Sequence, residues 1–161
     1  MSTGRIISSS AAFVVLVCFF LPWISVSCSE QEIATLSGYD LVAGTDIDLG
    51  VGTEEVEPDL VFLAVPLAAL VVFGLVLISA LEVFPGSLAA AGQVAAASIG
   101  LLVLAFKWLE ARSDSSDISF VSFSPEIGVW GVVAGLIVII VGAILSRFES
   151  AGPKRIDPGE T

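Results

Sequence analysis

The chain of 161 residues is long enough for one domain, and its 56% hydrophobic residues and mean hydropathy of +1.00 exclude an ordinary water-soluble globular protein. Its formal charge of -11 argues against nucleic acid as a partner, because nucleic-acid surfaces require an excess of Lys and Arg. The sequence contains no His, the commonest general base and a frequent metal ligand, so we expect no enzyme, no catalytic or metal-binding residue and no cofactor.

The first uncharged run covers residues 6–26 and follows a short polar start, residues 1–5, that carries Arg5. As a helix this run would be about 31 Å long, which matches the hydrocarbon core of a bilayer. Ser25 and Ser27 before Cys28 also fit a cleavable signal peptide, and a lipoprotein signal is a weaker alternative. The length of the run favours an uncleaved first transmembrane helix.

Two cysteines stand in this region. We expect Cys18 and Cys28 on one helix, about 15 Å apart at 1.5 Å per residue, which is too far for a disulfide. For Cys28 we favour a packing role beneath an outer sheet, and a covalent link to another chain or lipidation are alternatives.

The segment over 27–59 is expected to be an acidic extracytoplasmic loop, since nine of the 17 acidic residues lie between Glu30 and Asp59 and no Lys or Arg does. Residues 32–36 and 39–42, on either side of Ser37-Gly38, and residues 117–123 of the next outer loop have strand-like composition. We therefore predict a small sheet formed by both outer loops. Residues 45–59 are expected to be its most mobile part, and a solvated acidic loop or an adaptation to high salt is favoured there over a calcium site.

The rest of the chain predicts three further transmembrane helices. The expected segments are helices over 60–81, 87–109 and 127–146, a cytoplasmic turn over 82–86, an outer loop over 110–126 and a cytoplasmic tail over 147–161. The fold class expected is thus an all-α integral membrane protein, a four-transmembrane-helix bundle with a small extracytoplasmic β-structure formed by loops 1 and 2.

Charge and tryptophan positions predict the orientation. Most basic residues fall near the chain ends, which the positive-inside rule assigns to the cytoplasm, and we expect a multi-pass protein of the plasma membrane. Lys107 and Arg112 fall outside in this arrangement, where Lys107 is three residues from Glu110. The tryptophans agree with it, because they prefer the interface and all lie at expected outer helix ends: Trp23, Trp108 and Trp130.

Small residues at four-residue spacing predict close helix packing, since small side chains let backbones approach within lipid. The third helix carries Gly92, Ala96 and Gly100, and the fourth carries Gly131 and Gly135. Gln93 is the one strongly polar side chain expected at depth, and an interhelical hydrogen bond is favoured there over a substrate contact.

Three short motifs resemble those of a group of small bacterial four-span proteins, most of which have no assigned function. The motifs are Leu21-Pro22-Trp23 through Cys28, Leu36-Ser37-Gly38-Tyr39-Asp40-Leu41, and Gly128-Val129-Trp130-Gly131. In outline the chain is also similar to claudins, with four spans, cytoplasmic termini and a long first outer loop that begins with a Trp and a Cys. Claudins have two cysteines in that loop, whereas Cys28 stands alone here, so this likeness is one of architecture.

The function expected is that of a non-enzymatic membrane protein, either an accessory or structural subunit of a complex or a self-associating tetraspan. Its partners would be the lipid bilayer and other membrane-protein subunits or itself. The candidate residues for interactions of the outer domain are Trp23, Cys28, Gly38, Tyr39 and Asp40. The alternative is a small oligomeric channel or permease, in which Gln93 and an acidic outer vestibule attract cations.

Overall fold

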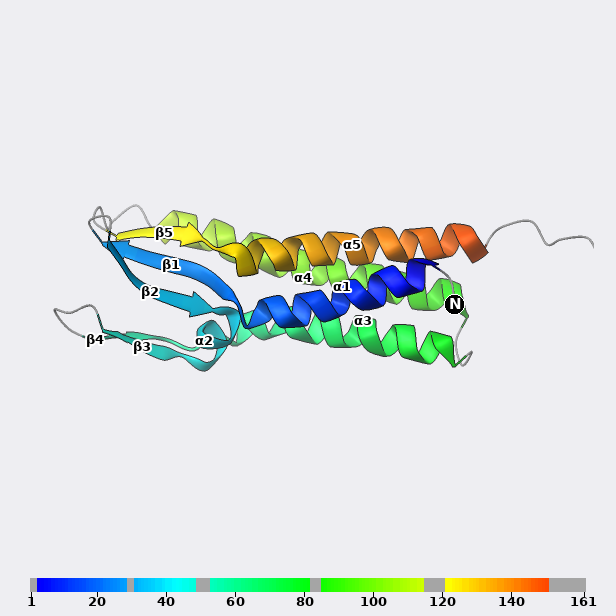
Figure 1. Ribbon diagram of the computed structural model, residues 1–161, viewed down its shortest axis with the longest axis horizontal. Helices are drawn as coiled ribbons and strands as arrows, with labels where there is room; N and C mark the ends of the chain where they lie inside the picture. Colours follow the sequence, from blue (N-terminus) through cyan, green and yellow to red (C-terminus); the bar gives the residue numbers. More distant parts are fainter. Residues whose placement is uncertain (1–2, 29–30, 49–52, 82–84, 115–120, 151–161) are drawn as a thin grey trace, which may run out of the picture.

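The computed structural model describes residues 3–28, 31–48, 53–81, 85–114 and 121–150. The protein is mostly helical, with a bundle of long helices and two small sheets at one end of it (Figure 1). The start of α1 (Thr3–Phe19) and the end of α5 (Ile127–Ser150) lie at the opposite end. The other elements are β1 (Pro22–Cys28), β2 (Gln31–Ser37), α2 (Gly38–Ala43), β3 (Thr45–Asp48), β4 (Thr53–Val56), the 3-10 turn η1 (Leu60–Leu63), α3 (Ala64–Ala80), α4 (Gly86–Asp114) and β5 (Val121–Pro125).

Three helical segments are long and apolar enough to cross a membrane: Leu60–Ala80, Gly86–Ala111 and Ile127–Glu149. The apolar helix α1 has 17 residues, about 25 Å at 1.5 Å per residue, and is shorter than these three. In the bundle α1 packs against α3 and α5, and α4 packs against the same two helices. The four long helices therefore form a closed bundle in which α1 and α4 lie diagonally.

Side-chain size separates the inside of the bundle from its outside. Most side chains buried in the interior are Ala or Val, such as Ala12, Val15 and Val72, and the largest fully buried ones in the bundle are Leu136 and Ile139 of α5. Large apolar side chains point outward from all four long helices, among them Phe13, Leu67, Leu102 and Ile137. Close packing thus comes from small residues, and the large apolar groups are left for the surroundings.

The larger sheet has the order β2-β1-β5, with β1 antiparallel to both neighbours. Two connections of the bundle contribute to it, because β1 and β2 lie between α1 and α3, and β5 lies between α4 and α5. The second sheet is the antiparallel hairpin β3-β4. The small sheet predicted from the sequence is therefore present, and β2 and β5 overlap two of its predicted strands.

The structure corrects the prediction at the first helix. Helix α1 ends at Phe19, not at Val26, and residues 22–28 form the central strand β1. Cys18 and Cys28 are thus not on one helix, so the distance that we assigned to them does not apply. The physical reason is Pro22, which disfavours helical backbone at Leu21 and is followed by the alternating pattern Ile-Ser-Val-Ser of a strand.

One further prediction in the acidic segment is wrong. Residues 39–42 belong to helix α2 and not to a strand, because Ser37 and Asp40 form a capping box that starts a helix. Residues 45–48 and 53–56 form the paired strands β3 and β4, which we did not predict, and residues 49–52 lie outside the described part.

Candidate functional site at the base of the sheets

Trp23 is the central side chain where the bundle meets the sheets. Pro22 and Ile24 of β1 pair with the adjacent residues Ser37 and Leu36 of β2, so Trp23 is the extra residue of a β-bulge. Its indole is 1% exposed and makes edge contacts with the rings of Phe19 and Phe62, at centroid distances of 5.8 and 5.9 Å. Trp23 therefore packs inside the protein as part of strand β1, and not at the end of the first helix as we predicted.

The polar edge of this indole is also satisfied within the chain. Trp23 Nε1 donates a hydrogen bond of 2.8 Å to the carbonyl oxygen of Cys18, in the last turn of α1. The Trp23 carbonyl accepts a bond of 2.8 Å from Glu126 N, just before α5. Trp23 thus fixes the sheet to the ends of α1 and α5 together.

Two glycines make room for Trp23. A Cβ at Gly38 would lie 2.8 Å from both the Trp23 Cε2 and the carbonyl oxygen of Phe19. A Cβ at Gly128 would lie 2.6 Å from Trp23 Cδ1 and 2.5 Å from the Pro22 carbonyl oxygen. The structure thus brings Trp23 and Gly38 together as a packing unit, and it adds Gly128, for which we predicted no packing role.

Tyr39 and Asp40 have different surroundings although both are in α2. The Asp40 carboxylate accepts hydrogen bonds from Ser37 N at 2.9 Å and from Ser37 Oγ at 2.7 Å, so it caps its own helix. Tyr39 is 54% exposed and its ring stacks on Phe20, with centroids 6.2 Å apart. Tyr39 can therefore contact another molecule at the surface, whereas the Asp40 carboxylate is already hydrogen-bonded to Ser37.

Cys28 ends β1 opposite Gln31 and Val121, and its side chain lies outside the described part.

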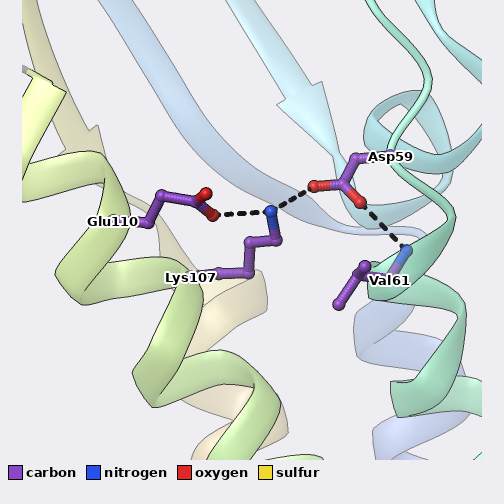
Figure 2. Close-up of polar contacts among 4 residues, drawn as sticks. All are labelled: Asp59, Val61, Lys107 and Glu110. Carbon is purple, nitrogen blue, oxygen red and sulfur yellow. Dashed lines mark hydrogen bonds and ion pairs between the residues drawn. The ribbon is translucent and has the colours of Figure 1, made fainter.

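A group of three charged residues joins α4 to the start of α3 (Figure 2). Lys107 Nζ lies 2.7 Å from Asp59 Oδ2 and 2.6 Å from Glu110 Oε2. Asp59 Oδ1 accepts a hydrogen bond of 3.0 Å from Val61 N and so caps the turn η1. The sequence indicated the Lys107–Glu110 pair by its spacing, but it gave no sign that Asp59, 48 positions before Lys107, is the second partner.

These contacts change the protonation of Asp59. The hydrogen bond from Lys107 lowers the pKa of the Asp59 carboxyl below its ordinary 3.8. The Val61 N–H and the Lys107 charge act in the same direction, and burial opposes them. Asp59 is therefore an ionised carboxylate at neutral pH and holds the Lys107 ammonium at the level where the helices meet the sheets.

The residues predicted to pack helices all lie at contacts within the chain. Gly131 and Gly135 face α1, where added Cβ atoms would lie 2.5 Å from Cys18 Sγ and from Val15 Cγ2. Gly92 faces Leu75 of α3, Gly100 faces Leu136 of α5, and Ala96 is half-buried against the core. We also find a close approach that we did not predict, between Gly4 and Gly142.

Gln93 lies inside the bundle with 4% of its surface exposed. Its amide forms no hydrogen bond with the described residues. The interhelical hydrogen bond that we expected is therefore absent among the described residues.

The residues at the base of the sheets hold the sheets and the helices together. Within the described residues no group of three or more Cys, Asp and Glu side chains is placed to hold a metal ion. At the base of the sheets Asp40 caps α2, the Trp23 indole donates a hydrogen bond, and Asp59 pairs with Lys107. No model of a known protein family, no curated protein and no solved structure matches this chain significantly.

Proposed function

We propose that the chain is a non-enzymatic polytopic membrane protein that crosses the plasma membrane four times, with α1 as the fourth span and both termini in the cytoplasm. Its sheets stand on the extracytoplasmic side. Its role is that of an accessory or structural subunit of a membrane complex. If the partner is a second copy of this chain, the protein is a self-associating tetraspan.

The observation that carries the proposal is the outward display of large apolar side chains by all four long helices around a small-residue interior. Val14 and Phe13 of α1 are exposed in the same way as Leu70 of α3 and Ile137 of α5. In water a protein with such a surface would aggregate. In a bilayer this surface contacts lipid tails or the helices of other subunits. Helix α1 shares this pattern, which supports its role as a span despite its length.

The outer part supports the accessory role. Within the described residues, strands β2 and β5 each pair with β1 on one side only, so each has an edge whose backbone groups have no strand partner there. The exposed Tyr39–Phe20 stack lies on the same end of the molecule. Together they offer contacts for another subunit at and above the membrane surface.

Cysteine labelling tests the topology. In a background with Cys18→Ser and Cys28→Ser, we expect Tyr39→Cys to react with a membrane-impermeant maleimide in intact cells. Phe148→Cys, at the opposite end of the bundle, should react only after permeabilisation. The reverse pattern would show an inverted orientation, and reaction of both variants in intact cells would contradict an even number of spans.

Purification in a mild detergent tests the accessory role. We expect the intact particle to contain other membrane proteins in fixed stoichiometry, or several copies of this chain, as judged by native mass spectrometry. A lone monomer after extraction from its native membrane contradicts the accessory and self-associating roles alike.

A further inference from the structure

The start of α1, which carries Arg5, and the end of α5, which carries Arg147, both lie at the end of the bundle away from the sheets (Figure 1). Gly4, which precedes Arg5, touches α5: an added Cβ would lie 2.6 Å from the Gly142 carbonyl oxygen and 2.7 Å from Ser146 N. Arg147 directly follows Ser146. The contact between the two backbones therefore puts Arg5 and Arg147 on neighbouring turns of packed helices.

Both guanidinium groups extend toward the connection between α3 and α4. Arg5 Nη1 donates to the carbonyl oxygen of Ser79 at 3.3 Å, and its Nη2 is 3.3 Å from the position of a Gly86 Cβ. Arg147 Nη2 donates to the carbonyl oxygen of Ser87 at 3.1 Å. Because Gly86 and Ser87 are consecutive, the two guanidinium groups converge on the start of α4.

Among the described residues, each arginine uses only a small part of its binding capacity. A guanidinium has five N–H donors, and one is used in each case within the described residues. Neither arginine forms an ion pair with a described carboxylate, since the ion pairs found there belong to Lys107 at the other end. Two nearby like charges repel, and an anion bound between them would replace this repulsion by attraction.

We propose that Arg5 and Arg147 bind the phosphate of an anionic phospholipid in the leaflet at this end of the bundle, an inference that rests on the membrane-spanning function proposed above. An arginine fork matches the geometry of phosphate oxygens. Leu88, next to Ser87, and Phe148, next to Arg147, are 57% and 72% exposed. They provide an apolar surface for an acyl chain beside the headgroup, which free phosphate could not use.

Native mass spectrometry of the purified full chain tests the site with phosphatidylglycerol and phosphatidylcholine as probes. We expect the wild type to retain phosphatidylglycerol preferentially. Arg5→Gln and Arg147→Gln should each weaken this preference about fivefold, and the double variant should lose it. Arg155→Gln is the matched control, because it makes the same charge change eight positions beyond Arg147. An equal loss in Arg155→Gln would show a general charge effect and overturn the site.

Thermal unfolding in detergent distinguishes the lipid from free phosphate. Phosphatidylglycerol should stabilise the wild type more than inorganic phosphate at the same concentration, and equal stabilisation by both would overturn the lipid assignment. Should the Gln variants fail to fold, the double variant Arg5→Lys/Arg147→Lys keeps the charge and should retain a weaker preference, since an ammonium lacks the planar fork. An undiminished preference in this Lys variant would overturn the arginine-specific geometry.

The two proposals can fail separately. Release of the wild type from membranes by alkaline extraction would contradict the membrane-spanning function itself. Resistance to extraction without a preference for phosphatidylglycerol would overturn only the lipid site.

Discussion

At the residue scale, packing around Trp23 leaves no volume for a side chain at Gly128. In Gly128→Ala the new methyl group would lie 2.5 Å from the Pro22 carbonyl oxygen, so the backbone of β1 or α5 has to shift. We expect the free energy of unfolding to fall by about 1–3 kcal/mol, as in other overpacked cores. Thermal unfolding of the purified protein in detergent measures this loss.

Gly74→Ala is the matched control for this substitution. Gly74 is also in a long helix, but an added Cβ there has no neighbour within 4 Å. The variant should be neutral or more stable by up to about 1 kcal/mol, because Ala favours helical backbone. A similar loss of stability in both variants would mean that the contacts of Gly128 with Pro22 and Trp23 do not determine its effect.

The Gln93 amide, which has no hydrogen-bond partner among the described residues, leads to a second prediction at this scale. A buried amide without a hydrogen bond costs free energy, and Leu fills a similar volume without a polar group. We expect Gln93→Leu to raise the free energy of unfolding by about 1 kcal/mol, measured by thermal unfolding in the same detergent. Cation flux into liposomes that Gln93→Leu abolishes would contradict this structural interpretation and favour the channel alternative.

At the element scale, the Asp59–Lys107 contact ties the start of α3 to α4. The pKa of Asp59 is lower in the folded chain than its ordinary 3.8. Between the pKa of Asp59 in the folded chain and its pKa in the unfolded chain, the unfolded chain therefore binds more protons. The ionised carboxylate thus stabilises the folded chain fully above pH 3.8, and this stabilisation is lost as the pH falls through the folded-state pKa.

Asp59→Asn tests this pH dependence, because Asn can still accept the hydrogen bond from Val61 N. Near neutral pH the variant should be less stable than the wild type by at most about 1 kcal/mol, since both partners keep some contact with solvent. The difference should shrink as the pH falls below 3.8. A difference in unfolding temperature that stays constant over this range would contradict the role assigned to the charge.

Prediction from sequence was reliable for elements defined by long apolar runs and unreliable where two patterns overlap. The helices around Leu60–Ala80 and Ile127–Glu149 follow directly from uninterrupted hydropathy. Hydropathy over residues 6–26 concealed strand β1, whose alternation is clear only once Pro22 is taken as the end of the helix. In residues 39–42 the capping box outweighed strand propensity.

In the candidate site, contacts between residues close in sequence could be predicted, and contacts between residues far apart in sequence could not. The cap formed by Ser37 and Asp40 is readable from their three-residue spacing. The contact of Asp59 with Lys107, and that of Gly128 with Trp23, join segments far apart in the chain. Such pairs depend on how helices and strands pack, which the pattern of one sequence does not contain.

At the scale of the whole molecule, the four long helices have unequal lengths. The apolar segment of α4 spans 26 residues, about 39 Å, whereas α1 has 17 residues, about 25 Å. Glycines of α5 hold α1 in close contact along its length, so α1 cannot tilt independently. The proposed membrane-spanning arrangement therefore requires the bilayer to thin beside α1 or the base of the sheets to enter the headgroup layer.

This mismatch predicts a dependence on bilayer thickness. In vesicles of phosphatidylcholines with increasing acyl-chain length, the unfolding temperature should be highest in the thinner bilayers, because a thick hydrocarbon core of about 30 Å or more exceeds the length of α1. Thermal unfolding followed by circular dichroism in each lipid measures the trend. An unfolding temperature that instead rises toward the longest acyl chains would contradict this prediction. It would show that the preferred bilayer thickness is determined by the three longer helices and not by α1.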